Sequence, residues 1–123
     1  MRVLLSIKPE FVYKIFSGEK RFEFRRVIFR RPDVNTVVVY ASSPIQRVVG
    51  EFTIHQILCD DILSLWSKTH ERSGITQELF LSYFRDRNHG FAIEIGAVTR
   101  YRKPLSLSRD FGLSPPQSYA YIS

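Results

Sequence analysis

The chain has 123 residues, of which 44% are hydrophobic and 14% aromatic, and this composition excludes a disordered protein. One cysteine cannot form an intramolecular disulfide, and no segment has the length and apolarity of a signal peptide or membrane span, so we expect a cytoplasmic protein with no membrane partner. The net charge of +6 favours an anionic partner. We predict one domain over residues 1–123, with a docked tail at residues 103–123.

The N-terminal quarter is predicted to form a strand, a helix and a second strand. The apolar run at residues 2–7 is typical of a buried strand. Pro9 suits the first turn of a helix and Gly18 suits its left-handed end, so the helix is expected between them. Residues 21–25 then alternate with period two, which places the two phenylalanines on one face. The opposite face carries Arg21, Glu23 and Arg25.

Two strands and two helices are predicted in the middle of the chain. Residues 35–42 are continuously apolar and β-branched, as expected of a central strand that is covered on both faces. Residues 47–58 carry apolar side chains mainly at even positions, which predicts a strand with one solvent-facing side. Asp60 and Asp61 suit the start of one helix, and Thr76 suits the N-cap of the next.

The C-terminal third is predicted to contain a last strand and a tail. Residues 90–101 alternate like a strand, whereas residues 103–123 are rich in Ser and Pro but still carry aromatic side chains that favour docking. The order strand, helix, three strands, helices, strand predicts a small α+β domain. Its strongly curved mixed sheet is expected to be flanked by about three helices.

Positive charge is concentrated at residues 20–31, where six cations surround the single acid Glu23. Such a local excess attracts phosphate or another polyanion. A solvated basic edge that discourages strand aggregation would have the same composition, and this alternative stays open. The cations are Lys20, Arg21, Arg25, Arg26, Arg30 and Arg31.

The chain resembles the ASCH family of the PUA-like superfamily through the motif G-x-K-x-x-E-x-R, formed here by Gly18, Lys20, Glu23 and Arg25. The resemblance extends to SIKPEF before the motif and to YASSP, VVGEF and GFAIEI after it. It implies a small PUA-like pseudo-β-barrel. It also implies a basic cleft beside the first helix and the motif strand that receives RNA or a modified nucleoside.

Some ASCH proteins hydrolyse the amide of N4-acetylcytidine, with a lysine at the position of Lys20 and a threonine nucleophile at the position of Glu23. The threonine is absent here, and a carboxylate cannot replace a hydroxyl nucleophile without changing the intermediate. Those enzymes also use a distal catalytic glutamate, and Glu71 is the only residue of this chain that is similar to it in position.

Two functions follow from these residues. In a binding module, Glu23 accepts the exocyclic amine of a base while Arg25 binds a phosphate or a carbonyl. In an enzyme, Lys20 and Glu23 transfer protons, either in an N4-acetylcytidine-type amidohydrolase or in a ribonuclease. The spacing of Glu23 and Arg25 equally fits an ion pair on an exposed strand.

Other candidate contacts are less sharply defined. Arg21, Arg26, Arg30 and Arg31 suit phosphates. Ser42 and Ser43 end the predicted central strand and offer hydroxyls to a base or sugar, although a Ser-Pro turn explains them equally. Tyr119 suits either base stacking or packing.

No metal site is predicted, since the three histidines lack zinc-like spacing, and no cofactor is expected. A helix-turn-helix at residues 60–85 would need a basic recognition helix, but TQELFLSYF contains no Lys or Arg. We therefore expect no sequence-specific binding to duplex DNA, and a transcriptional regulator is the least favoured function. The sequence does not indicate the oligomeric state.

Overall fold

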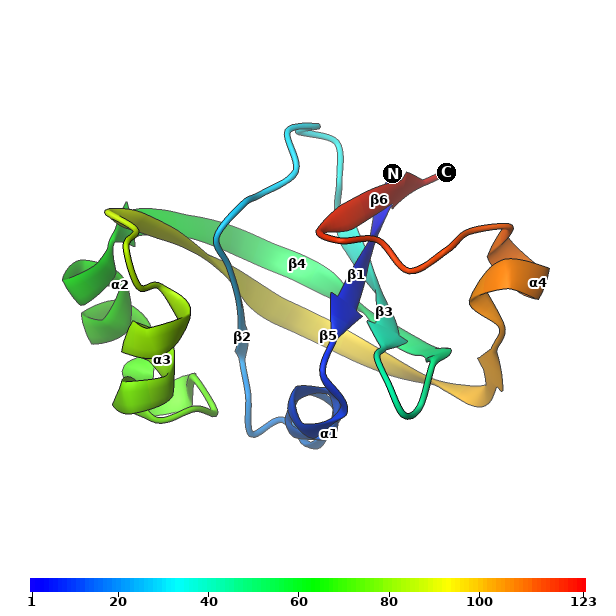
Figure 1. The fold of residues 1–123 in the computed structure, drawn as a ribbon, viewed down its shortest axis with the longest axis horizontal. Helices are drawn as coiled ribbons and strands as arrows, with labels where there is room; N and C mark the ends of the chain where they lie inside the picture. The colour runs from blue at the N-terminus through cyan, green and yellow to red at the C-terminus, as the bar shows by residue number, and fades with distance from the viewer.

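A computed structural model describes all 123 residues as one curved, mixed six-stranded sheet with four α-helices and a short 3-10 helix (Figure 1). The strands are β1 (Arg2–Ile7), β2 (Phe22–Arg25), β3 (Thr36–Ala41), β4 (Arg47–Asp61), β5 (His89–Leu105) and β6 (Tyr119–Ile122). The α-helices are α1 (Pro9–Ser17), α2 (Ile62–Thr69), α3 (Gln77–Tyr83) and α4 (Leu107–Phe111), and the 3-10 helix is His70–Arg72.

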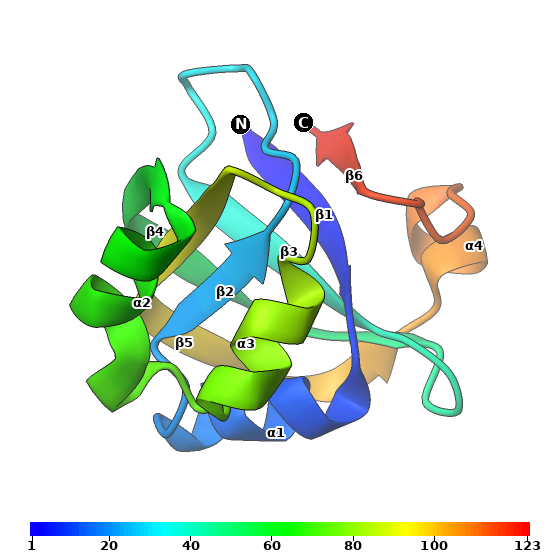
Figure 2. The same cartoon turned by 60° about the vertical axis from the view of Figure 1, so that its left-hand side comes forward.

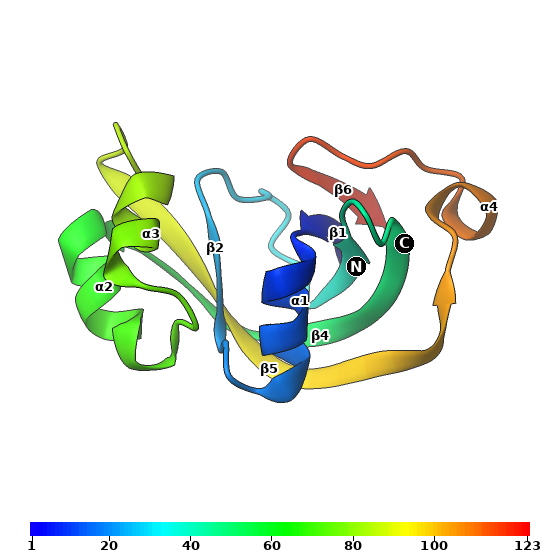
Figure 3. The same cartoon turned by 60° about the horizontal axis from the view of Figure 1, so that its bottom comes forward.

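The strand order is β2-β5-β4-β3-β1-β6, and only the β1–β3 pair is parallel. The sheet is curved but is not closed into a barrel, because β2 and β6 form its two edges. Figure 3 shows the long strands β4 and β5 bending around α1, which lies in the hollow between β2 and β1. The predicted α+β class and the three predicted helices are confirmed, and α4 is an additional short helix.

Three apolar clusters hold these layers together. The largest joins α1 to the hollow face of the sheet. A second, rich in phenylalanine, joins α2 and α3 to β2 and β5, as Figure 2 shows for α3 over β2. The third lies under α4. Successive β3 residues alternate between the first and third clusters, so the prediction of a central strand covered on both faces is confirmed.

Local signals in the sequence place the helix ends correctly. Gly18 has φ 85° and donates its N–H to the Ile15 carbonyl, which ends α1 in a left-handed turn. The side chain of Asp61 accepts the Ser64 N–H and begins α2. In the same way Thr76 begins α3.

The C-terminal region is more regular than its composition indicates. β5 extends past the predicted strand, because register shifts relative to β4 let the two long strands stay paired as they bend. Ser106 then caps α4, and β6 pairs antiparallel with β1. This pairing places the two ends of the chain side by side (Figure 1).

Candidate functional site

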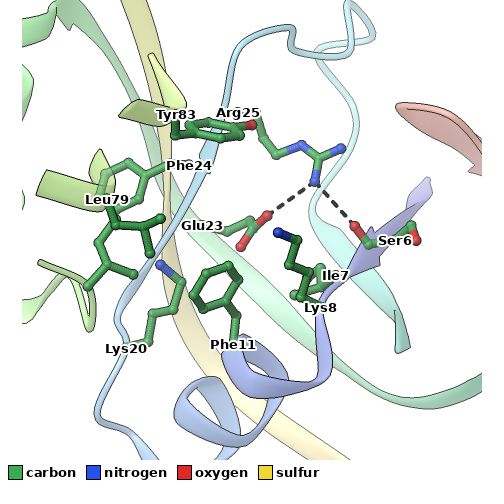
Figure 4. Close-up of a pocket in the computed structure, with 11 residues that line it drawn as sticks. Ser6, Ile7, Lys8, Phe11, Lys20, Glu23, Phe24, Arg25, Leu79 and Tyr83 are labelled. Carbon is green, nitrogen blue, oxygen red and sulfur yellow. Dashed lines mark hydrogen bonds and ion pairs between the residues drawn. The ribbon is translucent and has the colours of Figure 1, made fainter. Parts of the chain in front are cut away.

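A cavity of about 210 Å³ lies between α1, β2 and α3 and is partly open to solvent (Figure 4). Its walls combine apolar side chains with the charged residues of the G-x-K-x-x-E-x-R motif. The lining residues are Ser6, Ile7, Lys8, Phe11, Lys20, Glu23, Phe24, Arg25, Ile75, Leu79 and Tyr83.

Lys20 is placed by the left-handed turn that ends α1. Its backbone N–H donates to the Lys14 carbonyl, and its side chain is only 2% exposed. Nζ donates to the Ser73 carbonyl at 3.0 Å and lies 4.8 Å from the centre of the Phe24 ring. Gly74, with φ 70°, packs its backbone directly against this lysine. The amine is therefore held by a carbonyl and by aromatic faces, with little water around it.

Burial lowers the pKa of Lys20 from 10.5 to about 8. The nearby Glu23 carboxylate opposes this shift, and the positive charge of Lys14 adds to it. With a pKa of about 8, about a tenth of the molecules carry a neutral amine at pH 7. A neutral amine can accept a proton, so Lys20 has the electrostatic property that a general base needs.

Glu23 and Arg25 form a pair that is buried, since their side chains are 8% and 14% exposed. Oε2 of Glu23 accepts from Nη1 of Arg25 at 3.2 Å, and Arg25 also donates to the carbonyls of Ser6 at 3.4 Å and Ser118 at 2.8 Å. These bonds tie β2 to β1 and to the segment before β6. The burial does not fit the alternative of an ion pair on an exposed strand.

Oε1 of Glu23 makes no hydrogen bond within the chain. Every fully buried side-chain oxygen or nitrogen in the structure has a hydrogen-bond partner. Oε1 has none, so it is not fully buried, and it reaches the open part of the cavity. Figure 4 shows the carboxylate facing the space bounded by Phe11 and Leu79. The site therefore presents one carboxylate oxygen, already oriented by Arg25, to whatever enters.

α3 supplies a wall of the cavity that the spacing of its apolar residues does not reveal. Ile75, just before the helix, and Leu79 and Tyr83 within it recur every four residues, a spacing that predicts a buried helix face. Instead, Leu79 is 44% exposed and Tyr83 is half-buried at the cavity. Apolar periodicity cannot distinguish a cavity wall from a core face. The only feature of the sequence that distinguishes this row of residues from a core face is the hydroxyl of Tyr83.

Tyr83 brings a hydrogen-bond donor beside the charged pair. Partial burial raises the pKa of its phenol, so the group stays protonated. Its ring lies near Arg25 in Figure 4. Arg26 covers the ring from outside, with its guanidinium carbon 4.6 Å from the ring centre and Nε donating to the Tyr83 carbonyl at 2.6 Å.

The other predicted contacts lie outside the cavity. Arg21 donates to the carbonyls of Ile95 and Gly96 in β5. Ser42 and Ser43 form a turn before Pro44, and the Ser42 N–H donates to the Ile7 carbonyl.

Two further predicted residues are also remote from the lining. Tyr119 packs edge-to-face against Phe29, with the ring centres 6.1 Å apart. Glu71 is exposed in the 3-10 helix and lines a separate depression with Phe22 and Glu94. The structure thus gathers the motif residues in one cavity but does not bring the dispersed candidates into it.

This combination of fold and motif defines an ASCH-type domain. The crystal structure of the ASCH protein from Zymomonas mobilis superposes with a TM-score of 0.89 and 27% identity, covering 99% of this chain and 87% of that one. A curated protein from Zymomonas mobilis, the ASCH domain-containing ribonuclease, is 27% identical over 123 residues, which is 97% of this chain and 82% of that protein. The ASCH resemblance is confirmed.

The chain belongs to the family described as a domain of unknown function (DUF365), whose model matches residues 2–114. Two longer proteins of Ureaplasma parvum also contain a matching segment. ATP synthase subunit alpha is 30% identical over 121 residues, and large ribosomal subunit protein uL22 is 24% identical over 123. This chain spans only 15% and 39% of their lengths. None of its own helices has the length and apolarity needed to cross a membrane.

The buried Lys20 should make stability depend on pH. Its pKa is about 8 in the folded protein against 10.5 ordinarily, so between these values the unfolded chain binds more protons than the folded one. The free energy of unfolding should therefore rise with pH across this window, by up to about 3 kcal/mol in total. Lys20→Met should lack this rise. Urea unfolding of both proteins from pH 7 to 11 measures the difference, and parallel pH curves would contradict it.

Gly74→Ala should destabilise the protein more than Gly112→Ala. Both glycines have positive φ, 70° and 66°, so each substitution carries a similar backbone cost of about 1 kcal/mol. A Cβ at Gly74 would also lie 2.6 Å from Cβ of Lys20, whereas Gly112 has open space. We expect a further loss of about 1–3 kcal/mol at Gly74 from overpacking, measured by urea unfolding. Equal losses would show that Lys20 is not held by this turn.

Proposed function

We propose that this protein binds single-stranded RNA and places one nucleobase in the cavity between α1, β2 and α3. The observation that carries the proposal is the buried Glu23 carboxylate, which keeps one oxygen open to the cavity. A fixed carboxylate accepts the exocyclic amine of a base, as acidic side chains do with cytosine. The expected ligands are therefore bases that carry such an amine.

The remaining walls of the cavity complement a base in two ways. Phe11 and Leu79 offer apolar surface to its faces, as side chains do when they hold unstacked RNA bases. Tyr83 and Lys20 offer donors to its ring nitrogens and carbonyl oxygens. A volume of about 210 Å³ suits one base and not a base pair, so the base must be unpaired or flipped out of a helix.

The similarity to a Zymomonas mobilis protein that is named a ribonuclease supports RNA as the ligand class. It extends over nearly the whole of this chain and most of that protein. Binding to RNA is common to a binding module and to a nuclease, so this support does not depend on turnover.

A second candidate function is cleavage of the bound RNA, favoured by the lowered pKa of Lys20. The neutral amine would take the proton of a 2′-hydroxyl, whose oxygen attacks the neighbouring phosphorus. The bond from phosphorus to the 5′-oxygen breaks, and that oxygen takes a proton from water. This route needs no side-chain nucleophile, whereas hydrolysis of N4-acetylcytidine in the ASCH family uses a threonine where this chain has Glu23.

Glu23→Gln tests the base-binding proposal. The cytidine hexamer r(C)6 should bind more tightly than the uridine hexamer r(U)6, because uracil has no exocyclic amine. Glu23→Gln should reduce this preference by about tenfold, since an ionic acceptor is replaced by a neutral amide that also presents a donor. Fluorescence anisotropy measures the four affinities. Glu71→Gln removes an exposed glutamate outside the cavity and is the matched control. A preference that survives Glu23→Gln would contradict the proposal.

Cleavage is tested by incubating the hexamers with the protein and resolving the products by electrophoresis. Product should be half-maximal at a pH of about 8 and level off above it, because the neutral form of Lys20 is the active one. Lys20→Met should form no product, while Lys68→Met, which removes an exposed lysine paired with Asp60, should cleave normally. Cleavage that persists in Lys20→Met would exclude this lysine as the base.

A further inference from the structure

The arginines that the sequence concentrates at residues 20–31 are largely engaged within the fold. Arg21 and Arg26 donate to backbone carbonyls. Arg25 and Arg31 are each paired with a carboxylate. Of the five arginines in this run, only Arg30 is exposed and has neither a side-chain hydrogen bond nor a salt bridge, so most of the free positive charge must be sought elsewhere.

A second cavity, of about 290 Å³, lies on the other side of α1. It is bounded by α1, the turn between β3 and β4, and the end of β5. Its lining includes the apolar residues Val12, Phe16 and Val49, and Tyr13 stands at its edge with 62% of its surface exposed. An aromatic ring that is this exposed beside a hollow offers a face for stacking.

The charged residues of the second cavity are all cations. Arg100 and Arg102 line it, and no acidic residue does. Neither arginine forms a salt bridge, and Arg100 is held 5.3 Å over the ring of Phe16. Arg47 lies opposite the lining residue Ala41 in the β3–β4 register, which puts it on the same face of the sheet. The cavity therefore suits a ligand that is both anionic and aromatic.

The two cavities approach each other at the first turn of α1. Lys8 lines the first cavity and the adjacent residue Pro9 lines the second. Lys8 is exposed and forms no salt bridge, so an unpaired cation also lies between the two cavities. A single strand of nucleic acid supplies both kinds of group that these surfaces match, since bases alternate with phosphates along it.

We infer that the second cavity binds a neighbouring nucleotide of the RNA strand whose base occupies the first cavity. Its base stacks on Tyr13, and Arg100 and Arg102 hold phosphate. This inference rests on the proposed function and makes it narrower, because the natural ligand is then an oligonucleotide and not a free nucleoside. An acidic peptide would match the arginines but would not need the exposed ring of Tyr13.

The test compares a short and a long ligand, the nucleoside cytidine and r(C)6, by calorimetric titration over a series of salt concentrations. For r(C)6, Arg100→Gln/Arg102→Gln should reduce the slope of log K against log salt by about 1.4, the value for two phosphate contacts on a single strand. Tyr13→Ala should weaken r(C)6 about tenfold through lost stacking, while Tyr13→Phe should bind normally. Neither change should alter the affinity for cytidine, which has no phosphate and fills only the first cavity.

The control for net charge is Arg72→Gln/Arg109→Gln, which removes two exposed arginines outside both cavities. If this control lowers the salt slope as much as Arg100→Gln/Arg102→Gln, the effect is diffuse attraction and the second site is overturned. A poly-glutamate peptide that displaces r(C)6 at equal affinity from wild type and from Tyr13→Ala would also overturn it. Thermal unfolding checks that each variant is folded. Arg100 packs over Phe16, so its substitution can disturb the fold, whereas Tyr13 is exposed and its substitution tests the second site without that risk.

The proposal for the first cavity and the inference about the second cavity can be overturned separately. Loss of the salt-slope effect with retained sensitivity to Glu23→Gln would overturn the second site and leave the proposed function standing. A salt slope that depends on Arg100 and Arg102, with no effect of Glu23→Gln on either ligand, would support the second site and overturn the base cavity. If r(C)6 does not bind at all, both are wrong.

Discussion

The structure depends on the burial of three charged side chains, two on the short edge strand β2 and one just before it. Lys20, Glu23 and Arg25 lose much of their hydration, a cost that a folded protein accepts only when each group gains partners. Those partners are mostly backbone carbonyls from distant segments, those of Ser73 and Ser118 among them. The loop after α2, strand β1 and the C-terminal segment therefore converge on β2. The candidate site is thus also a point that joins the two sides of the curved sheet.

The sequence predicts the elements that local rules govern, and the end of α1 at Gly18 is the clearest case. Period-two alternation separates Glu23 from its phenylalanine neighbours, but it does not indicate that both faces of β2 are covered. That coverage depends on the curvature of β4 and β5, which brings α1 and α3 to opposite sides of the strand. Tyr83 shows the same limit, because only the tertiary arrangement turns an apolar helix face into a cavity wall.

Charge density along the chain proves a poor guide to charge that is free to bind a ligand. The basic run at residues 20–31 predicts a strong phosphate-binding strip, yet long guanidinium side chains reach carbonyls in neighbouring strands. Arg47, Arg100 and Arg102 form no comparable run, and the pairing of β3, β4 and β5 brings them to one face. Such a group can be found only after the strand register is known, because residues about fifty positions apart must be aligned.

The separation of the two cavities by α1 also bears on the chemistry of Lys20. A phosphate held beside this amine would favour its protonated form and raise its pKa above the value of about 8 that burial sets. Cleavage brings one phosphate, the one that the 2′-hydroxyl attacks, close to the amine, but further phosphates held by Arg100 and Arg102 across the helix would not lower the neutral fraction more. Binding alone does not require this separation, since a protonated lysine also donates to a base. Proton abstraction depends on the neutral fraction of Lys20, so the position of the remaining phosphates affects cleavage more than it affects binding.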